Sequence, residues 1–167
     1  MHSRTEVENQ IKALSDVSWL FPSQAAVHQE LLPFLGGFHR IVNLYGLQGV
    51  GKTFLAHILR KENRVDYISS PDLMRPADQP LVIDNAPFER TIVRGMRNQM
   101  RKFDLRQVIL ITRYRVEDSV PAFALNLTPD DVLYFRSNLF RYLDLHLPEC
   151  SALNLWEHLK LIGGVNG

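Results

Sequence analysis

Residues 46–53 read GLQGVGKT and lie between the apolar run RIVNLY (40–45) and the segment FLAHILR (54–60). The stretch matches the pattern G-x-x-x-x-G-K-[ST] at every fixed position, in the strand-then-helix context that this pattern requires. Glycines let the backbone curl so that several N–H groups point at phosphate oxygens, and the N-terminus of the following helix favours anions. We therefore predict a phosphate-binding loop.

Each part of this loop has an expected role in holding a nucleotide. Lys52 can reach the β- and γ-phosphates, and Thr53 can place its hydroxyl on Mg²⁺. The expected cofactors are therefore ATP and Mg²⁺. The predicted nucleotide-binding residues are Gly46, Leu47, Gln48, Gly49, Val50, Gly51, Lys52, Thr53 and Phe54.

A second signal is the apolar run LVID (81–84), which ends in an acid 32 residues after Lys52. In phosphate-loop proteins an acid at this place lies beside the first strand and holds the magnesium side of the site. An aspartate at a strand end is by itself usually a turn former. Its position on a strand of the same predicted sheet makes Asp84, with Thr53, the predicted metal pair.

A third signal is the strand QVILIT (107–112), after which Thr112 or Arg113 would lie at the carboxyl edge of the sheet. Ligands of open α/β sheets bind at this edge. A polar group there can contact the γ-phosphate or the attacking water. The alternative, that Thr112 only caps the strand and Arg113 is solvated, stays open at this point.

Apolar runs alternate with helical segments along the chain, which indicates a parallel sheet buried on both faces. We predict an α/β fold, a three-layer P-loop NTPase with a parallel five-stranded sheet. The expected strands are 40–45, 64–69, 81–84, 107–112 and 142–147. The expected helices are 5–16, 24–35 with Ser23 as its N-cap, 52–63, 87–104 and 152–162, and 70–80 is expected to be a loop with one helical turn.

Length and composition favour one nucleotide-binding domain over residues 1–167. We expect a core over about 20–150, an N-terminal extension over 1–20 and a C-terminal helix within 151–167. The net charge of +1 indicates no class of partner, and the single cysteine, Cys150, excludes an internal disulfide framework. No apolar run approaches the ~20 residues of a membrane span, and the N-terminus is no secretory signal, so we expect a cytoplasmic protein without a membrane partner.

VNLYGLQGVGKTFLAHIL (42–59) resembles the opening of the AAA+ and STAND branches of the phosphate-loop ATPases. LVIDN resembles the Walker B motif of these families, and VILITR resembles their sensor-1 strand. The resemblance covers roughly residues 20–147 and extends to the small replication-initiator and helicase-loader AAA+ ATPases. It implies an ATPase fold with a reduced or absent helical lid, limited to one helix.

The part of the chain after VILITR can be aligned with these families in two competing ways. In the AAA+ style, FRSNLFRYLDLHLPE (135–149) is similar to a stretch that holds a fifth strand, which makes Arg136 the candidate arginine finger and Arg141 the second choice. In the STAND style, FALNLTPDDVLYF (123–135) resembles a passage of the signalling ATPases. We favour the AAA+ alignment because YLDLHLP is the better strand in the sequence.

One departure from the AAA+ pattern bears on catalysis. Walker B of that family normally ends Asp-Glu, whereas Asn85 follows Asp84 here. An amide cannot accept a proton at neutral pH, so it is a poor general base. Glu89 would substitute only if the backbone curled back. The resemblance thus implies nucleotide binding with weak hydrolysis, and the predicted catalytic set is Asp84, Asn85, Thr112 and Arg136.

A basic stripe is predicted on the helix within 87–104. Residues 88–115 hold eight Lys or Arg and two acids. Four arginines fall at i, i+4, i+7 and i+11, so they share one face of the helix, where like charges repel unless an anion meets them. A solvated face is the competing interpretation. The predicted anion- or partner-binding residues are Arg90, Arg94, Arg97 and Arg101.

These observations support two hypotheses of function. The first is an ATP·Mg²⁺-binding module that uses bound nucleotide to gate self-assembly or partner binding. The second is an active AAA+-type ATPase that a neighbouring subunit or partner completes, acting on DNA in replication, loading or a transposition-like role. A scaffold that has lost nucleotide is disfavoured by the intact Lys52 and Thr53. The expected partners are a second copy of the chain or another protein, with DNA as a further candidate.

Overall fold

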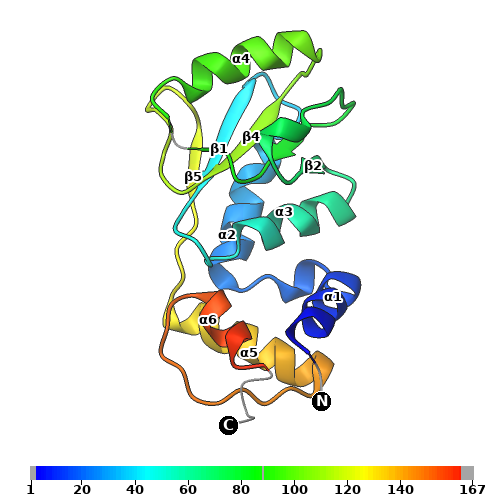
Figure 1. Ribbon diagram of the computed structural model, residues 1–167, viewed down its shortest axis with the longest axis vertical. Coiled ribbons are helices and arrows are strands. Elements are labelled where there is room, and N and C mark those ends of the chain that lie inside the picture. The colour runs from blue at the N-terminus through cyan, green and yellow to red at the C-terminus, as the bar shows by residue number, and fades with distance from the viewer. Residues whose placement is uncertain (1–2, 88, 163–167) are drawn as a thin grey trace.

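The fold is given by a computed structural model, which describes residues 3–87 and 89–162 (Figure 1). Within these residues, five parallel strands form one sheet in the order β2-β3-β4-β1-β5. This arrangement confirms the predicted α/β fold with a parallel five-stranded sheet. The strands are β1 (Ile41–Tyr45), β2 (Asp66–Ile68), β3 (Leu81–Ile83), β4 (Val108–Thr112) and β5 (Ala122–Ala124).

The fifth strand is not the predicted one. β5 pairs with β1 through Asn43 and Ala122, whereas residues 142–147 contain the end of a helix followed by irregular chain. The prediction of a strand there was wrong because Leu143, Leu145 and Leu147 alternate for another reason: they pack against a cluster of helices. Residues 123–135, which supported the competing alignment, comprise the end of the edge strand β5, a connecting segment and the start of the next helix.

Helix boundaries follow local capping signals. The longest described helix, α5 (Pro129–Leu143), starts at a capping box between Thr128 and Asp131 with proline at its first turn. Similarly, Pro22 opens α2, so Ser23 lies inside the helix and is not its N-cap. The other helices are α1 (Arg4–Leu14), α2 (Pro22–Leu31), α3 (Lys52–Lys61), α4 (Ile92–Lys102) and α6 (Leu155–Lys160).

Three short 3-10 turns are also present among the described residues, and the second continues α2 toward the end of the predicted helix 24–35. They are η1 (Val17–Trp19), η2 (Leu32–Phe34) and η3 (Pro71–Leu73). The last one is the predicted turn within the loop 70–80, and no other helix separates β2 from β3 among the described residues. The predicted helix 87–104 begins only at Ile92. Residue 88, like residues 163–167 of the predicted C-terminal segment, lies outside the described part of the chain.

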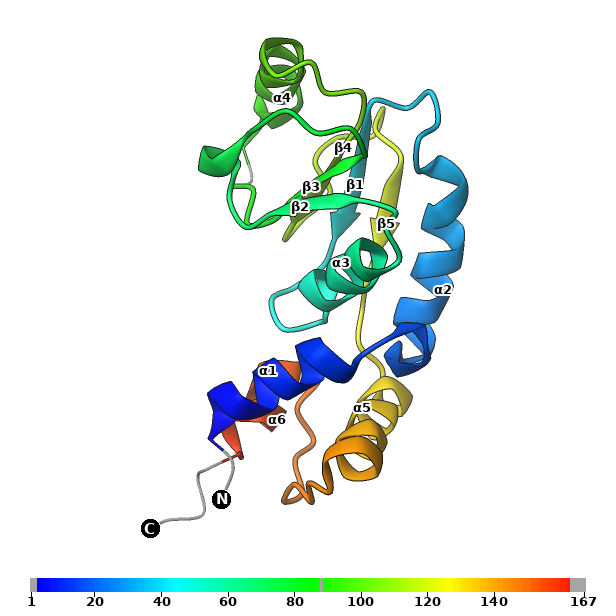
Figure 2. The same ribbon diagram turned by 90° about the vertical axis from the view of Figure 1, so that its right-hand side faces the viewer.

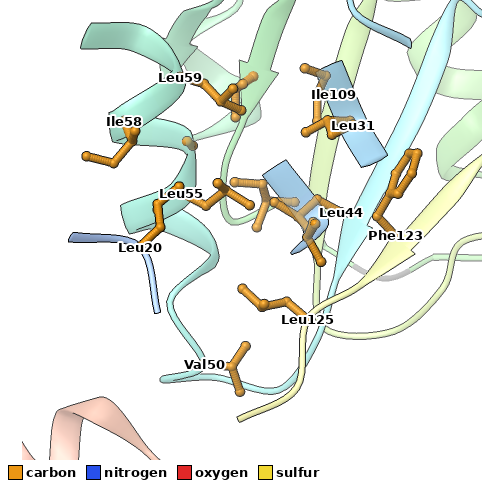
Figure 3. Packing of buried hydrophobic residues seen from close by; sticks show 14 of the residues in the cluster. Leu20, Leu31, Leu44, Val50, Leu55, Ile58, Leu59, Ile109, Phe123 and Leu125 are labelled. Carbon is orange, nitrogen blue, oxygen red and sulfur yellow. The ribbon is translucent and has the colours of Figure 1, made fainter. Parts of the chain in front are cut away.

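Two buried clusters cover the two faces of the sheet, which confirms the three layers. Alternation along each strand sends successive side chains to opposite faces. Leu44 of β1 packs with α2 and α3, where Leu31, Leu55 and Leu59 belong to the same buried cluster (Figure 3). Ile41 of β1 faces α4 and its buried residues Val93, Met96 and Met100.

A third cluster joins both ends of the chain. Val7 and Ile11 of α1 pack with Leu139 of α5 and Leu159 of α6. We call α1, α5 and α6 the helical cluster; Figures 1 and 2 show it below the sheet and α3. Two helices thus follow the last strand, where the AAA+ resemblance implied one. None of the described helices has the length and apolar character needed to cross a membrane.

Candidate phosphate-loop site

A cavity of about 880 Å³ lies at the carboxyl edge of the sheet. It lies between this edge, the N-terminal half of α3, and helices α1 and α6. Its volume falls in the usual range of small-molecule sites. Of the predicted residues, the lining includes Gln48, Gly49, Gly51, Lys52, Thr53, Phe54, Asp84, Asn85 and Thr112.

The loop between β1 and α3 adopts an open turn over this cavity. Gly49 and Gly51 have φ values of 81° and 93°, which favour glycine. Gly51 is also the N-cap of α3 and supplies no side-chain cap, so the first N–H groups of the helix stay free for an anion.

Lys52 bends back over the loop. Its Nζ donates to the carbonyl oxygens of Gly46 (2.5 Å) and Leu47 (2.8 Å). Burial lowers the pKa of Lys52 below its ordinary value, the Asp84 carboxylate opposes this shift, and the Arg113 guanidinium adds to it. A desolvated cation held by two carbonyl groups is well suited to exchange them for phosphate oxygens, with which it forms stronger, charge-assisted bonds.

The predicted metal pair is in contact. Thr53 Oγ1 donates to Oδ2 of the buried Asp84 at 2.6 Å. Because an ionised carboxylate only accepts hydrogen bonds, the threonine proton is committed and its oxygen lone pairs remain available. Oxygen donors of this kind are what Mg²⁺ prefers, and magnesium usually keeps waters and phosphate oxygens as its other ligands. The two residues therefore fit a magnesium site that a bound nucleotide completes.

No independent metal site competes with this pair in the described residues. A cluster of three or more His, Cys, Asp or Glu side chains that could hold an ion is absent from residues 3–87 and 89–162. A metal at Asp84 would thus depend on the phosphates for most of its ligands.

Tyr67 of β2 is part of the same contact network and was missed in the sequence. Its hydroxyl donates to Asp84 Oδ2 at 2.8 Å. Burial raises the pKa of Tyr67 far above its ordinary value, and the bond to Asp84 adds to the shift, so the phenol stays protonated and remains a donor. Nothing in the local pattern of residues 64–69 distinguishes this tyrosine from one that packs in the core.

Thr112 and Arg113 at the end of β4 have different surroundings. The Thr112 hydroxyl accepts from Asn43 Nδ2 (2.9 Å) and donates to the carbonyl of Tyr114 (2.6 Å). Arg113 is exposed and lines the cavity. The hydroxyl of Thr112 thus bonds to the local backbone, whereas the Arg113 guanidinium lies over the Tyr114 ring, close enough to Lys52 to affect its pKa.

Helix α6 touches the phosphate loop directly. Leu155 N donates to Gly49 O at 2.8 Å, and Asn154 Nδ2 donates to Gln48 O at 3.3 Å. The side chain of Asn154 fills the space beside Gly49, where an added Cβ would lie 2.1 Å from its Oδ1. Trp156 of the same helix lines the cavity.

Helix α1 closes the cavity from the other side and is anchored to α3. Lys61 Nζ donates to the carbonyls of Lys12 (3.2 Å), Ala13 (3.1 Å) and Ser15, at the C-terminal end of α1. Cations are favoured at this end of a helix. A predicted N-terminal extension therefore contributes walls to the cavity, through Glu8, Ile11 and Lys12.

The basic stripe lies elsewhere: Arg94, Arg97 and Arg101 are on the exposed face of α4, whereas Arg90 precedes the helix, so the prediction that all four share one helix is wrong. All four side chains are exposed, and none has an ion-pair partner among the residues that the structure describes. They do not line the cavity. The four are Arg90, Arg94, Arg97 and Arg101.

Comparison with solved structures matches this arrangement to replication initiators. A DnaA bound to AMPPCP and single-stranded DNA shares 17% identity at a TM-score of 0.56, over 85% of this chain and 60% of that one. A DNA replication initiation factor shares 17% identity at a TM-score of 0.55, over 81% of this chain and 57% of that one. AMPPCP-bound DnaA from Aquifex aeolicus shares 17% identity at a TM-score of 0.52, over 81% of this chain and 57% of that one.

This chain shares the fold of these solved structures. It spans about six-tenths of the length of the solved structures that it matches. No family model and no curated protein matches the sequence.

Two positions of this fold have surroundings that differ from what the resemblance implied. Asn85 takes a left-handed backbone conformation with φ 52°, and its Nδ2 donates to Ser69 O at 2.9 Å. The amide thus ties the end of β3 to the end of β2. Glu89 does not line the cavity, so it does not replace the missing carboxylate.

Arg136 lies apart from the cavity, in the middle of α5. Its guanidinium donates to Leu147 O (2.5 Å) and contacts His158 Nδ1 (3.2 Å). His158 Nε2 lies 2.8 Å from Ala152 O, and this pairing is consistent with a neutral ring that accepts at Nδ1. A role as arginine finger would require Arg136 to give up both contacts. Arg141, in contrast, is exposed and lies over the ring of Tyr142.

Proposed function

We propose that this protein binds ATP·Mg²⁺ and uses the bound state to gate self-assembly or the binding of a partner. The observation that carries the proposal is the shared cavity, in which Lys52 faces the loop and Thr53 contacts the buried Asp84. Each of these groups has the chemistry that a nucleoside triphosphate with its metal requires.

The charge and shape of the cavity support the same ligand. Its lining has four cationic side chains, Lys12, Lys52, Arg60 and Arg113, against the carboxylates of Glu8 and Asp84. This excess of positive charge suits a polyphosphate. Trp156, Phe54 and Leu159 supply an apolar wall that suits a base.

Weak hydrolysis is part of the proposal. No carboxylate follows Asp84, and the amide of Asn85 is engaged by Ser69 O. A general base contributes ~10²–10⁴-fold to a rate, and its absence here favours holding the nucleotide over cleaving it.

The contacts of α6 support gating. Asn154 and Leu155 hold the carbonyls of Gln48 and Gly49, so a loop that turns toward phosphate also changes its contacts with α6. A ligand shifts a conformational equilibrium by its different affinity for the two states. Nucleotide binding at the loop is thereby linked to the position of the helical cluster.

The experiment is a titration of the purified chain with mant-ATP, a fluorescent ATP analogue, with and without Mg²⁺. Light scattering after size exclusion then compares the assembly state with ATP, with ADP and without nucleotide. We expect saturable, magnesium-enhanced binding and an assembly state, alone or with a partner, that depends on ATP. The absence of saturable binding would show that the proposal is wrong.

Replacing Arg113 by glutamine is expected to weaken binding of ATP about tenfold while changing the affinity for ADP much less. The reason is that Arg113 lies at the strand end beside Lys52, where it can contact the γ-phosphate. Competition against mant-ATP measures both affinities. Arg115→Gln is the matched control, because Arg115 pairs with Asp118 outside the cavity. An equal loss for both nucleotides would contradict the assignment.

Replacing Asn85 by glutamate is expected to raise the hydrolysis rate by far less than the ~10²–10⁴-fold of a well-placed general base. The backbone at this position directs the side chain toward Ser69 O, which repels a carboxylate, and the left-handed φ disfavours glutamate. Phosphate release under multiple-turnover conditions is the measurement. Asn85→Ala controls for loss of the amide. A hundredfold gain would show that the amide alone limits hydrolysis.

A second candidate function is an ATPase that a neighbour completes on DNA. The three arginines of α4, with Arg90 just before it, favour this function, since an exposed cationic face without a described carboxylate partner suits a phosphate backbone. Steady-state hydrolysis should then rise with protein concentration or with added single-stranded DNA. A flat, near-zero rate under these conditions supports the binding module instead.

A further inference from the structure

The carboxylate of Asp84 is held from three directions. Oδ2 accepts from Thr53 Oγ1 (2.6 Å) and from the Tyr67 hydroxyl (2.8 Å), while Oδ1 accepts from Asn85 N (2.7 Å). Asp84 is only 4% exposed, so solvent does little to orient it. These three donors decide where both of its oxygens lie.

The two hydroxyl donors to Oδ2 come from different parts of the fold. Thr53 belongs to the first turn of α3, whereas Tyr67 reaches in from β2 at the edge of the sheet. A carboxylate oxygen has two lone pairs, and these two bonds use both. Tyr67 therefore prevents the carboxylate from rotating about its Cβ–Cγ bond, which would break the contact with Thr53.

We propose that Tyr67 is a positioning residue for the metal side of the site. By fixing Oδ2, it keeps the Thr53 hydroxyl hydrogen-bonded to Asp84. The lone pairs of the threonine oxygen then face the magnesium of a bound nucleotide. Partners that orient a metal-side carboxylate typically change metal affinity when they are removed. This inference rests on the proposed ATP·Mg²⁺ function and adds to it a residue outside the sequence motifs.

A purely structural role for Tyr67 is the competing explanation. Its ring packs against the cluster that covers the α2 and α3 face of the sheet. Phenylalanine keeps this packing and removes only the hydroxyl, so Tyr67→Phe separates the two roles. Tyr134→Phe is the matched control, because its hydroxyl also donates to one oxygen, Ser18 O at 2.8 Å, on the surface of the helical cluster.

The experiment measures three quantities on the full chain of the wild type and both variants. They are the affinity for mant-ATP in EDTA, the Mg²⁺ concentration that half-saturates the fluorescence change at fixed mant-ATP, and the melting temperature. We expect Tyr67→Phe to raise the Mg²⁺ midpoint about tenfold and to leave metal-free affinity within about twofold. Tyr134→Phe should leave the Mg²⁺ midpoint unchanged.

The outcomes distinguish this inference from the function on which it rests. If the wild type does not bind mant-ATP, the proposed function is wrong, and the inference is wrong with it. If the wild type binds with magnesium enhancement and Tyr67→Phe has the same Mg²⁺ midpoint, only the inference is overturned, whatever the melting temperature. If metal-free affinity and the Mg²⁺ midpoint of Tyr67→Phe change in parallel with its melting temperature, the role is structural, and the inference is likewise overturned.

Discussion

Replacing Lys52 by alanine is expected to weaken binding of mant-ATP with Mg²⁺ by about 100-fold or more. Lys52 is the cation closest to the loop carbonyls of Gly46 and Leu47, which it would exchange for phosphate oxygens. Removing one partner of a desolvated, hydrogen-bonded charge pair costs about 2–5 kcal/mol, which corresponds to this loss. The measurement is a fluorescence titration at constant ionic strength, because screening changes the contribution of charges.

The stability of the Lys52→Ala chain should change little. Its ammonium is partly desolvated and lies near Arg113, so its loss removes two hydrogen bonds but also an unfavourable interaction. Lys102→Ala is the matched control, since Lys102 is exposed at the end of α4 and lies over the ring of Phe103. Equal affinity of wild type and Lys52→Ala for mant-ATP would contradict the assignment of the phosphate loop.

The second large effect is expected at Asn43, in the middle of β1. Asn43→Ala should lower the free energy of unfolding by about 3 kcal/mol. This side chain is fully buried, donates to Leu110 O (3.0 Å) and Thr112 Oγ1 (2.9 Å), and accepts from Val116 N (3.0 Å). Alanine leaves the Val116 N–H group without its acceptor and the Thr112 hydroxyl without this donor, and it creates a small cavity. Urea denaturation followed by circular dichroism measures the change.

Asn98→Ala is the control for Asn43→Ala. Asn98 is exposed on α4, so its replacement should change stability by less than about 0.5 kcal/mol. A loss below about 1 kcal/mol for Asn43→Ala would show that the network around Thr112 contributes little. Because Asn43 also holds Val116, just beyond Arg113, the same variant should weaken the preference for ATP over ADP.

Much of the fold was predictable because its strands are short apolar runs buried on both faces. β1, β2, β3 and β4 lie within the predicted segments, but β4 lies between β1 and β3, so the expectation that the strand of Asp84 lies beside the first strand was wrong. The run at 142–147 shows the limit of that reasoning. Its alternating leucines match strand periodicity, yet they pack against α1 and α6, and only the third dimension distinguishes the two kinds of burial.

Part of the candidate site was likewise predictable from the sequence, and part was not. Thr53 and Asp84 were predicted as a metal pair, and their contact fits that prediction, since the carboxyl ends of parallel strands meet at one edge of the sheet. The hydrogen-bond partners of Arg136 and Thr112 were not predicted. Their guanidinium and hydroxyl groups are used by Leu147 O and Tyr114 O, and a motif match does not reveal which groups are already hydrogen-bonded.

The sequence by itself determined the GLQGVGKT motif, the position of Asp84 at the end of an apolar run and the asparagine that follows it. These features depend on residue type and on local backbone conformation, which short patterns record. Only the tertiary structure decided that Tyr67 holds Asp84, that Asn154 touches Gln48 and that α1 closes the cavity. Their partners lie 17, 106 and about 50 residues away in the chain, and such contacts arise from packing of whole elements.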